Sequence, residues 1–319
     1  MKFPVFDFHC DTTHALLGND LREFGSLKNN NHHIDLTRAS QLPGYAQCFA
    51  CFTTTGDAIL KGLQPHELFE RELAVFMREI ESNKEVVQQA FSTQDVVKNL
   101  EDGKMSAILT IEGPAGFGYD LELLEDLHKI GFRITTLGWN EENVLTGSCV
   151  TGGGLTDAGK AFVDEAQRLG MLIDVSHISD EGFWDIIHRT KAPVIATHSN
   201  SRSIHNVPRN LTDDMFRAIM ETDGLTGINL YPGFLGENAS LDTVCDHIFH
   251  FLEMDTSGKH IALGGDLDGI NKLPVGFAGI ESYGDLATSL LARGLDADLV
   301  MNIFWNNALR VLNHNDSRT

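Results

Sequence analysis

The side chains that could bind a metal ion first appear close to the amino terminus. His9 and Asp11 stand two residues apart at the end of a short apolar run, Val5 to Cys10, which predicts a buried strand. Because side chains alternate across a strand, we expect His9 and Asp11 to point to one side. Phe8 and Cys10 are then expected on the other side. An imidazole and a carboxylate at this spacing suit a divalent cation, but a pair taken alone is more often a histidine hydrogen-bonded to a neighbouring acid.

Later strands supply the partners that such a site requires. Polar residues of the same two kinds follow further apolar runs, so that three histidines and three acids stand at predicted strand ends: His9, Asp11, Glu112, His177, His198 and Asp266. Buried charges require partners or a metal ion. A mixed imidazole and carboxylate set suits zinc or another first-row divalent ion, and a bridging carboxylate would suffice for two of them. The set therefore predicts a metal centre.

Eight short apolar runs must position these residues. The predicted strands are Val5 to Cys10, Tyr45 to Thr53, Met105 to Glu112, Phe132 to Leu137, Met171 to Val175, Pro193 to Thr197, Leu225 to Leu230, and the run with its loop from Ile261 to Gly269. Helical patterns separate most of them, such as Pro65 to Asn83, whose predicted apolar face includes Met77. This order predicts an α/β fold, a (β/α)₈ TIM barrel, in which the carboxyl ends of all strands meet on one face. No linker or change of composition divides the chain, so we expect one domain over residues 1–319.

Composition restricts the partners and the compartment. The 319 residues include Lys+Arg 24 and Asp+Glu 45, a net charge of −21, which argues against nucleic acid or an anionic membrane surface. The chain starts without an apolar leader and contains no apolar run of about 18 residues, so no membrane span is predicted. Five cysteines without a disulfide-framework spacing indicate reduced thiols and a cytoplasmic protein.

Seven short motifs occur in a fixed order: Phe6-Asp7-Phe8-His9-Cys10-Asp11, Ile111-Glu112-Gly113, Gly154-Leu155-Thr156, Arg168 to His177, Thr197-His198-Ser199, Arg209-Asn210, and Gly264 to Gly269. Together they resemble the membrane (renal) dipeptidase family, peptidase family M19 of the amidohydrolase-like barrels. The resemblance covers nearly the whole chain.

The resemblance implies a cofactor of two zinc ions. His9, Asp11 and Glu112 would hold the first ion. Glu112, His177 and His198 would hold the second, so that Glu112 bridges the two.

The resemblance also implies the roles of the residues around the metal ions. Asp266 would transfer the proton, whereas Asp268, the second acid of the same motif, is expected to be structural. Arg209 would bind the terminal carboxylate of a peptide substrate, and Tyr231 would contact that substrate.

One position departs from the family pattern. Where the vertebrate enzymes carry a histidine that is thought to polarise the scissile carbonyl, this sequence has Trp139. An indole donates one hydrogen bond but carries no charge. Either Trp139, its neighbour Asn140 or the metal stabilises the oxyanion instead, or the activity differs. The family's secretion signal and lipid-anchor tail are also missing, which is typical of a soluble, bacterial-type member, and the resemblance allows a homodimer.

The function implied by these features is hydrolysis of short peptides, mainly dipeptides, by a hydroxide that two zinc ions share, with a D-residue as an option on the C-terminal side. A related binuclear hydrolase of another amide or a lactone is the first alternative. Several such relatives use a carboxylated lysine as the bridge, but residues 132–155 contain no lysine. A non-catalytic metal-binding barrel is the second alternative, and the presence of all five ligand positions and Asp266 argues against it.

Overall fold

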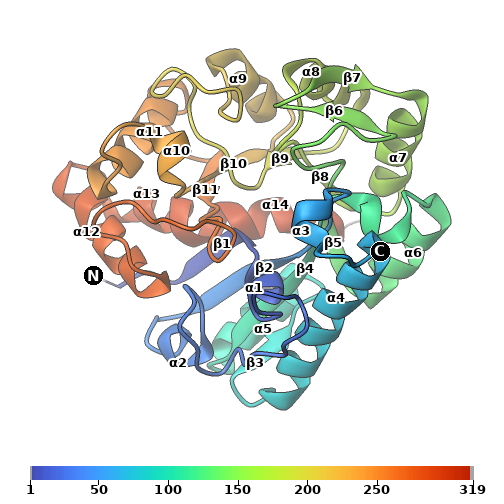
Figure 1. The fold of residues 1–319 in the computed structure, drawn as a ribbon. Coiled ribbons are helices and arrows are strands. Elements are labelled where there is room, and N and C mark those ends of the chain that lie inside the picture. Colours follow the sequence, from blue (N-terminus) through green and yellow to red (C-terminus); the bar gives the residue numbers. More distant parts are fainter. Residues whose placement is uncertain (1, 317–319) are drawn as a thin grey trace.

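Eight parallel strands close into a barrel in the computed structural model, which describes residues 2–316 (Figure 1). They follow the order β2-β1-β11-β10-β9-β8-β5-β4, and pairing of β2 with β4 closes the ring. Their bounds are Val5–Cys10 (β1), Tyr45–Phe52 (β2), Met105–Glu112 (β4), Phe132–Thr136 (β5), Leu172–Asp174 (β8), Val194–Ala196 (β9), Leu225–Ile228 (β10) and Ile261–Leu263 (β11). The predicted (β/α)₈ barrel is confirmed, with every predicted strand in its place.

Helices surround the barrel (Figure 1). The longer ones are α4 (Pro65–Ser82), α5 (Thr93–Glu101), α6 (Leu121–Ile130), α7 (Asp157–Arg168), α8 (Asp180–Arg189), α9 (Asp213–Glu221), α11 (Leu241–Met254), α12 (Tyr283–Ala292) and α14 (Asn307–Asp316). The short ones are α1 (Thr12–Ala15), α2 (Leu36–Ala39), α3 (Asp57–Leu60), α10 (Pro232–Leu235), α13 (Ala297–Met301), and the turns η1 (Pro114–Phe117), η2 (Ile280–Ser282) and η3 (Asn302–Asn306). None of the helices within residues 2–316 is long and apolar enough to cross a membrane.

The inward face of α4 differs from the prediction. Met77 is 39% exposed, whereas Glu72 and Glu79 are buried. Glu72 accepts a hydrogen bond from the backbone N–H of Phe52, and Glu79 accepts one from that of Leu27. These carboxylates satisfy backbone donors at the end of β2 and in the loop that contains Leu27, which an apolar side chain cannot do.

Three short strands were not predicted. The glycine-rich stretch Gly152–Leu155 forms β7 and pairs antiparallel with β6 (Thr146–Ser148). Strand β3 (Val87–Gln89) pairs with β4 outside the ring. The pairing of β6 with β7 could not be predicted, because the alternation of residues within one short segment does not show which segment it pairs with.

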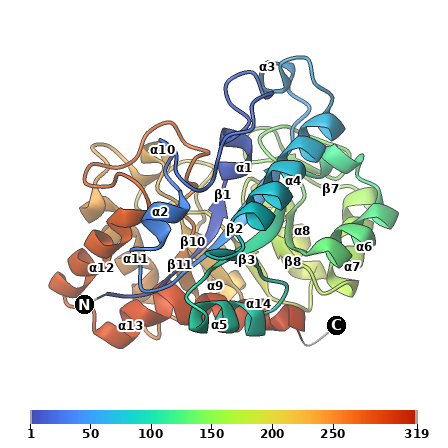
Figure 2. The same cartoon turned by 90° about the horizontal axis from the view of Figure 1, so that it is seen from below.

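The lower end of the barrel is closed. Phe6, Phe8 and Ile195 belong to one interior cluster together with Trp305 of η3 and Val311 of α14. Figure 2 shows α14 and α5 beneath the strands, opposite α1, which follows the carboxyl end of β1. A site inside the barrel can therefore form only at the carboxyl ends of its strands.

The expectation for Phe8 was wrong. Phe8 packs in the barrel interior, where its ring stacks on Phe6 at 5.3 Å, while Cys10 packs in the outer layer. The pairing of β1 with β2 shifts register between Asp7 and Cys10, because three steps along β1 match two steps along β2. This bulge interrupts the alternation, so that Phe8 lies inside the barrel and His9 joins the site as well.

Candidate metal centre

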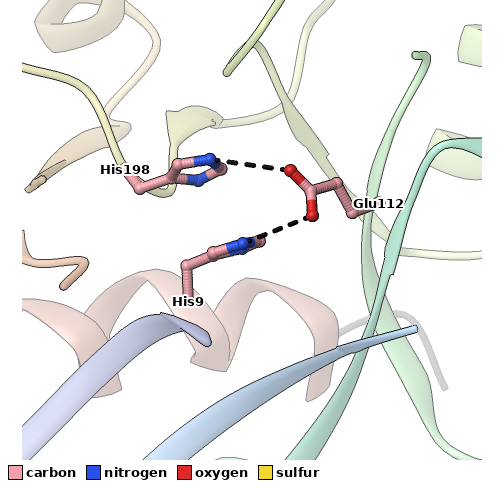
Figure 3. Close-up of side chains that lie close together, drawn as sticks. All are labelled: His9, Glu112 and His198. Carbon is pink, nitrogen blue, oxygen red and sulfur yellow. Dashed lines mark ion pairs between the residues drawn. The ribbon is translucent and has the colours of Figure 1, made fainter. Parts of the chain in front are cut away.

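The six predicted residues converge above the carboxyl ends of the strands. Glu112 stands at the end of β4 and is 3% exposed. Its Oε2 lies 3.4 Å from Nε2 of His9, and its Oε1 lies 3.1 Å from Nε2 of His177 and 3.7 Å from Nε2 of His198. Figure 3 shows Glu112 between His9 and His198. Each oxygen of this one carboxylate therefore faces a different part of the site.

His177 and His198 present unprotonated nitrogens to each other. Nδ1 of His177 lies 2.9 Å from Oδ1 of Asn140, an atom that can only accept, so the proton is on Nδ1. Nδ1 of His198 lies 2.7 Å from the hydroxyl of Thr197. The two Nε2 atoms are only 3.0 Å apart. Burial, followed by nearby positive charge, lowers the pKa of both rings well below the usual range and keeps them neutral. Two facing lone pairs at this distance repel each other, and a bound cation would relieve that repulsion.

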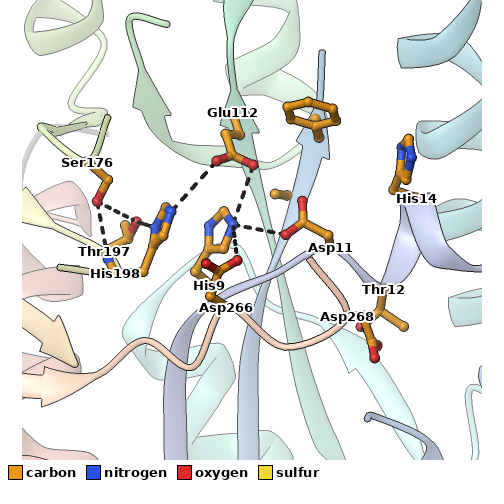
Figure 4. A network of polar contacts seen from close by, with 12 residues as sticks. His9, Asp11, Thr12, His14, Glu112, Ser176, Thr197, His198, Asp266 and Asp268 are labelled. Carbon is orange, nitrogen blue, oxygen red and sulfur yellow. Dashed lines mark hydrogen bonds and ion pairs between the residues drawn. The ribbon is translucent and has the colours of Figure 1, made fainter. Parts of the chain in front are cut away.

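His9 completes the other part of the site. Its Nε2 lies 3.3 Å from Oδ2 of Asp11 and has no hydrogen-bond partner, although it is buried. Burial alone would lower the pKa of His9, but Glu112 and Asp11 raise it well above its usual range (Figure 4). A Cβ atom at Gly269 would lie 2.1 Å from Oδ2 of Asp11, so only glycine leaves this space open. The surroundings of His9 Nε2 thus favour positive charge.

The residues present fit divalent ions. Ligand atoms of His9, Glu112 and His198 lie within 4.8 Å of one another, and so do those of His9, Asp11 and Asp266. The atoms are imidazole nitrogens and carboxylate oxygens, the donor types that zinc prefers. Burial raises the pKa of Glu112 to about 8, which shows how costly its charge is without a cation.

The two acids of the loop after β11 have different surroundings. Asp266 has a positive φ of 57°, and Oδ2 accepts a hydrogen bond of 2.9 Å from Asn229, while burial raises its pKa to about 6. Asp268 turns away from the centre. Its Oδ2 accepts from the hydroxyl of Thr12 at 2.6 Å, and its Oδ1 accepts from the backbone of His33 at 2.5 Å. Asp268 therefore joins its own loop to the start of α1 and to the loop at His33, and Asp266 remains at the centre.

Arg209 is a buried cation without a carboxylate partner among the described residues. It is 6% exposed, and one nitrogen, Nη1, donates to Oγ of Ser199 at 2.7 Å. Its Nε and Nη2 have no hydrogen-bond partner. The guanidinium lies over the ring of Phe234 at 5.5 Å, and burial lowers its pKa. Two buried donors directed at no acceptor are suited to an incoming carboxylate.

A cavity of about 270 Å³ opens beside the centre, and it contains the remaining predicted residues. It is lined by Trp139, Asn140, His177, Tyr231, Phe234, Asp266, Gly269, Ile270 and Asn271. The Trp139 ring is held edge-on by Phe52 at 5.1 Å and lies 6.1 Å from the His177 ring. Asn140 lines the cavity but also orients His177, a contact that the sequence did not predict.

Three buried polar residues near the centre were missed in the sequence. Asn229 holds Asp266, Asp174 anchors the ends of β8 and β9, and Glu72 holds the end of β2. Asn229 and Asp174 also stand at carboxyl ends of predicted strands, so the signal that indicated the candidate ligands applies to them too. Glu72 gives no such signal, because it lies in the middle of a helix.

Comparisons with known proteins agree with this arrangement. The family model described as membrane dipeptidase, peptidase family M19, matches residues 1–318. An uncharacterized dipeptidase of Schizosaccharomyces pombe is 36% identical over 214 residues, which are 65% of this chain and 52% of that protein. The matched region thus spans about half the length of that relative. An uncharacterized protein from the pqqA 5′ region of Klebsiella pneumoniae is 32% identical over 262 residues, 78% of this chain and 96% of that protein.

A solved structure shares the fold over its full length. It is a metallo peptidase from Rhodobacter sphaeroides, liganded with a phosphinate mimic of the dipeptide L-Ala-D-Ala. Its TM-score is 0.89 at 27% identity, with 99% of this chain and 100% of that chain covered. Together with the family match over nearly every residue, this shows that the chain belongs to the membrane dipeptidase family, peptidase family M19.

Proposed function

We propose that this protein is a zinc-dependent dipeptidase acting on short peptides with a free terminal carboxylate. The observation that carries the proposal is the buried guanidinium of Arg209, with two donors that lack a partner, in the loop that follows the His198 position. A carboxylate bound there places the substrate at a fixed distance from the centre. Only a short peptide then has its scissile bond next to Glu112 and Asp266.

The cofactor in this proposal is a pair of zinc ions. His9, Asp11 and Glu112 would hold one, and Glu112, His177 and His198 would hold the other, with Glu112 as the bridge. Bound divalent ions supply Lewis acidity, which polarises a carbonyl group and acidifies water. The separate direction of the two Glu112 oxygens supports this assignment.

The chain's own residues orient the substrate and move the proton. Asp266 takes the proton from the attacking water and delivers it to the leaving amine, while Asn229 fixes the orientation of its carboxyl group. Trp139 and Tyr231 flank the substrate in the cavity. In place of the family's histidine, Trp139 contributes an apolar wall, and Asn140 acts through His177.

The stereochemistry of the substrate follows by analogy. The Rhodobacter sphaeroides protein was solved with a mimic of L-Ala-D-Ala, and we propose that a D-residue is also accepted here on the C-terminal side. We further propose a one-domain protein over residues 1–319 that works in the cytoplasm, where its five free cysteines stay reduced. A homodimer remains a prediction, which light scattering tests.

Metal analysis combined with a substrate panel tests the proposal. Purified protein should contain two zinc ions per chain. It should hydrolyse L-L and L-D dipeptides, and it should not hydrolyse their C-terminal amides or simple lactones at comparable rates. A preference for lactones or blocked amides with both metals bound would show that the centre serves another substrate class.

A further inference from the structure

Asp174, at the end of β8, is a buried acid that the proposed mechanism does not use. It is 1% exposed, and no ion pair joins it to a cation among the described residues. Its Oδ1 accepts hydrogen bonds from the backbone N–H groups of Ser176, at 2.8 Å, and Thr197, at 2.9 Å. A buried carboxylate is unfavourable unless such donors satisfy it. These two donors belong to the segments that carry His177 and His198.

This carboxylate joins the ends of two neighbouring strands. Ser176 precedes His177, whose φ of 70° is rare for a residue with a side chain. Thr197 precedes His198, whose backbone N–H in turn donates to Oγ of Ser176 at 3.2 Å (Figure 4). The positions of both histidines therefore depend on a single side chain in the layer beneath them.

A second contact runs from Asp174 to the ring of His198. The hydroxyl of Thr197 has one proton, and it donates that proton to Oδ2 of Asp174. Its oxygen can then only accept from Nδ1 of His198, at 2.7 Å, which fixes the proton of the ring on Nδ1. A hydroxyl that donates to a carboxylate accepts a stronger hydrogen bond than a free hydroxyl does. The stronger bond to Nδ1 makes the His198 ring more basic, so its Nε2 is a better metal ligand.

We propose that Asp174 is a positioning residue for the metal ion held by His177 and His198, acting through Ser176 and the Thr197 hydroxyl. This inference rests on the proposed function, because it concerns one of the two zinc ions. We call the hydrogen-bond chain from Asp174 through the Thr197 hydroxyl to His198 the relay. His177 bonds only to the neutral amide of Asn140, so the relay makes His198 alone a stronger metal ligand.

Zinc competition titrations with a chelator of known affinity test the relay. Thr197→Val keeps the shape of the side chain and removes the hydroxyl, and Asp174→Asn weakens the anchor. In both variants we expect the second zinc ion to bind about 10- to 100-fold more weakly, the usual effect of losing a partner behind a ligand. The first zinc ion should bind as in the parent, and Thr197→Ser should restore the second site.

Thr226 provides a matched control. It is a buried threonine on the neighbouring strand β10, and its hydroxyl has no hydrogen-bond partner. Thr226→Val should leave both zinc affinities unchanged. The relay is wrong if Thr197→Val binds both ions with parental affinity.

A readout without metal separates this inference from the proposed function. Long-range ¹H–¹⁵N spectra of histidine-labelled protein report which nitrogen of His198 carries the proton. In the parent that nitrogen should be Nδ1, and in Thr197→Val the preference should be lost. A parent that binds fewer than two zinc ions contradicts the proposed function, while the spectra still decide on the relay. If the proton of His198 stays on Nδ1 in Thr197→Val as in the parent, the relay is wrong.

Discussion

Asn229 donates a hydrogen bond from its side-chain amide to Oδ2 of Asp266 over 2.9 Å, while Oδ1 of Asp266 lies 4.0 Å from Nε2 of His9. One oxygen of this acid is therefore fixed, and the other faces the centre. This division suits a group that holds and releases a proton at a defined place.

Asp266→Asn should lower kcat by about 10²- to 10⁴-fold, because the amide cannot transfer the proton. The asparagine side chain has nearly the same size as that of Asp266, so the metal content of the variant should stay near that of the parent. Steady-state kinetics with metal analysis of the same sample measures both effects. Asp268→Asn is the control, since Asp268 bonds to Thr12 and His33 instead. A greater loss of kcat in Asp268→Asn, with metal retained, would mean that the roles of the two acids are exchanged.

Glu112→Ala should release more than one equivalent of metal per chain. The two oxygens of Glu112 face different histidines, so the substitution removes a ligand from both proposed ions. Metal analysis after gel filtration gives the stoichiometry. Two ions retained in Glu112→Ala would contradict the bridging role.

Arg209→Ala should lower kcat/KM for dipeptides about 10- to 100-fold. A hydrogen bond to a charged group contributes roughly 1.5–3 kcal/mol to binding, and the Arg209 guanidinium has two donors without a partner. The parent should prefer free dipeptides to their C-terminal amides, and the variant should discriminate much less. The measurement is kcat/KM for both substrates with both proteins. Equal turnover of acid and amide by the parent would exclude the carboxylate contact.

The stability of the fold should depend on pH through His247, which lies away from the metal centre. It is fully buried on α11, and Nδ1 accepts from the backbone N–H of Ser201 while Nε2 bonds to the carbonyl of Leu235. Burial lowers the pKa of His247 to about 4. His247 in the unfolded chain binds a proton near pH 6.5, whereas buried His247 in the folded chain does not. The contribution of neutral His247 to the free energy of unfolding is therefore fully present above pH 6.5. It is lost as the pH falls toward 4.

His247→Gln removes this titration but keeps one acceptor and one donor. Between pH 7.5 and pH 4.5, the parent should lose about 2–3 kcal/mol more free energy of unfolding than this variant. Urea unfolding in the presence of a chelator measures the difference without a contribution from metal release. His188→Gln, at an exposed histidine, should follow the parent. An identical pH dependence of the parent and His247→Gln would show that His247 does not cause the loss.

Local sequence determined the strands and most of the candidate ligand set. Each apolar run is a strand because it is short, buried and ended by polar residues, and parallel strands in a closed barrel bring those ends to one face. His9, Asp11, Glu112, His177, His198 and Asp266 could therefore be grouped without coordinates. The family motifs then specified which residues are expected to share an ion.

Only the tertiary structure decided the contacts between strands and the exceptions to local periodicity. The bulge in β1 depends on the register with β2, so alternation alone misplaced Phe8. Asp174 and Thr197 are 23 positions apart, and the pairing of β8 with β9 brings them together. Whether a buried polar group finds a partner depends on every element packed around it. The structure thus shows that Glu72 has partners and that two donors of Arg209 have none, and no local pattern carries that information.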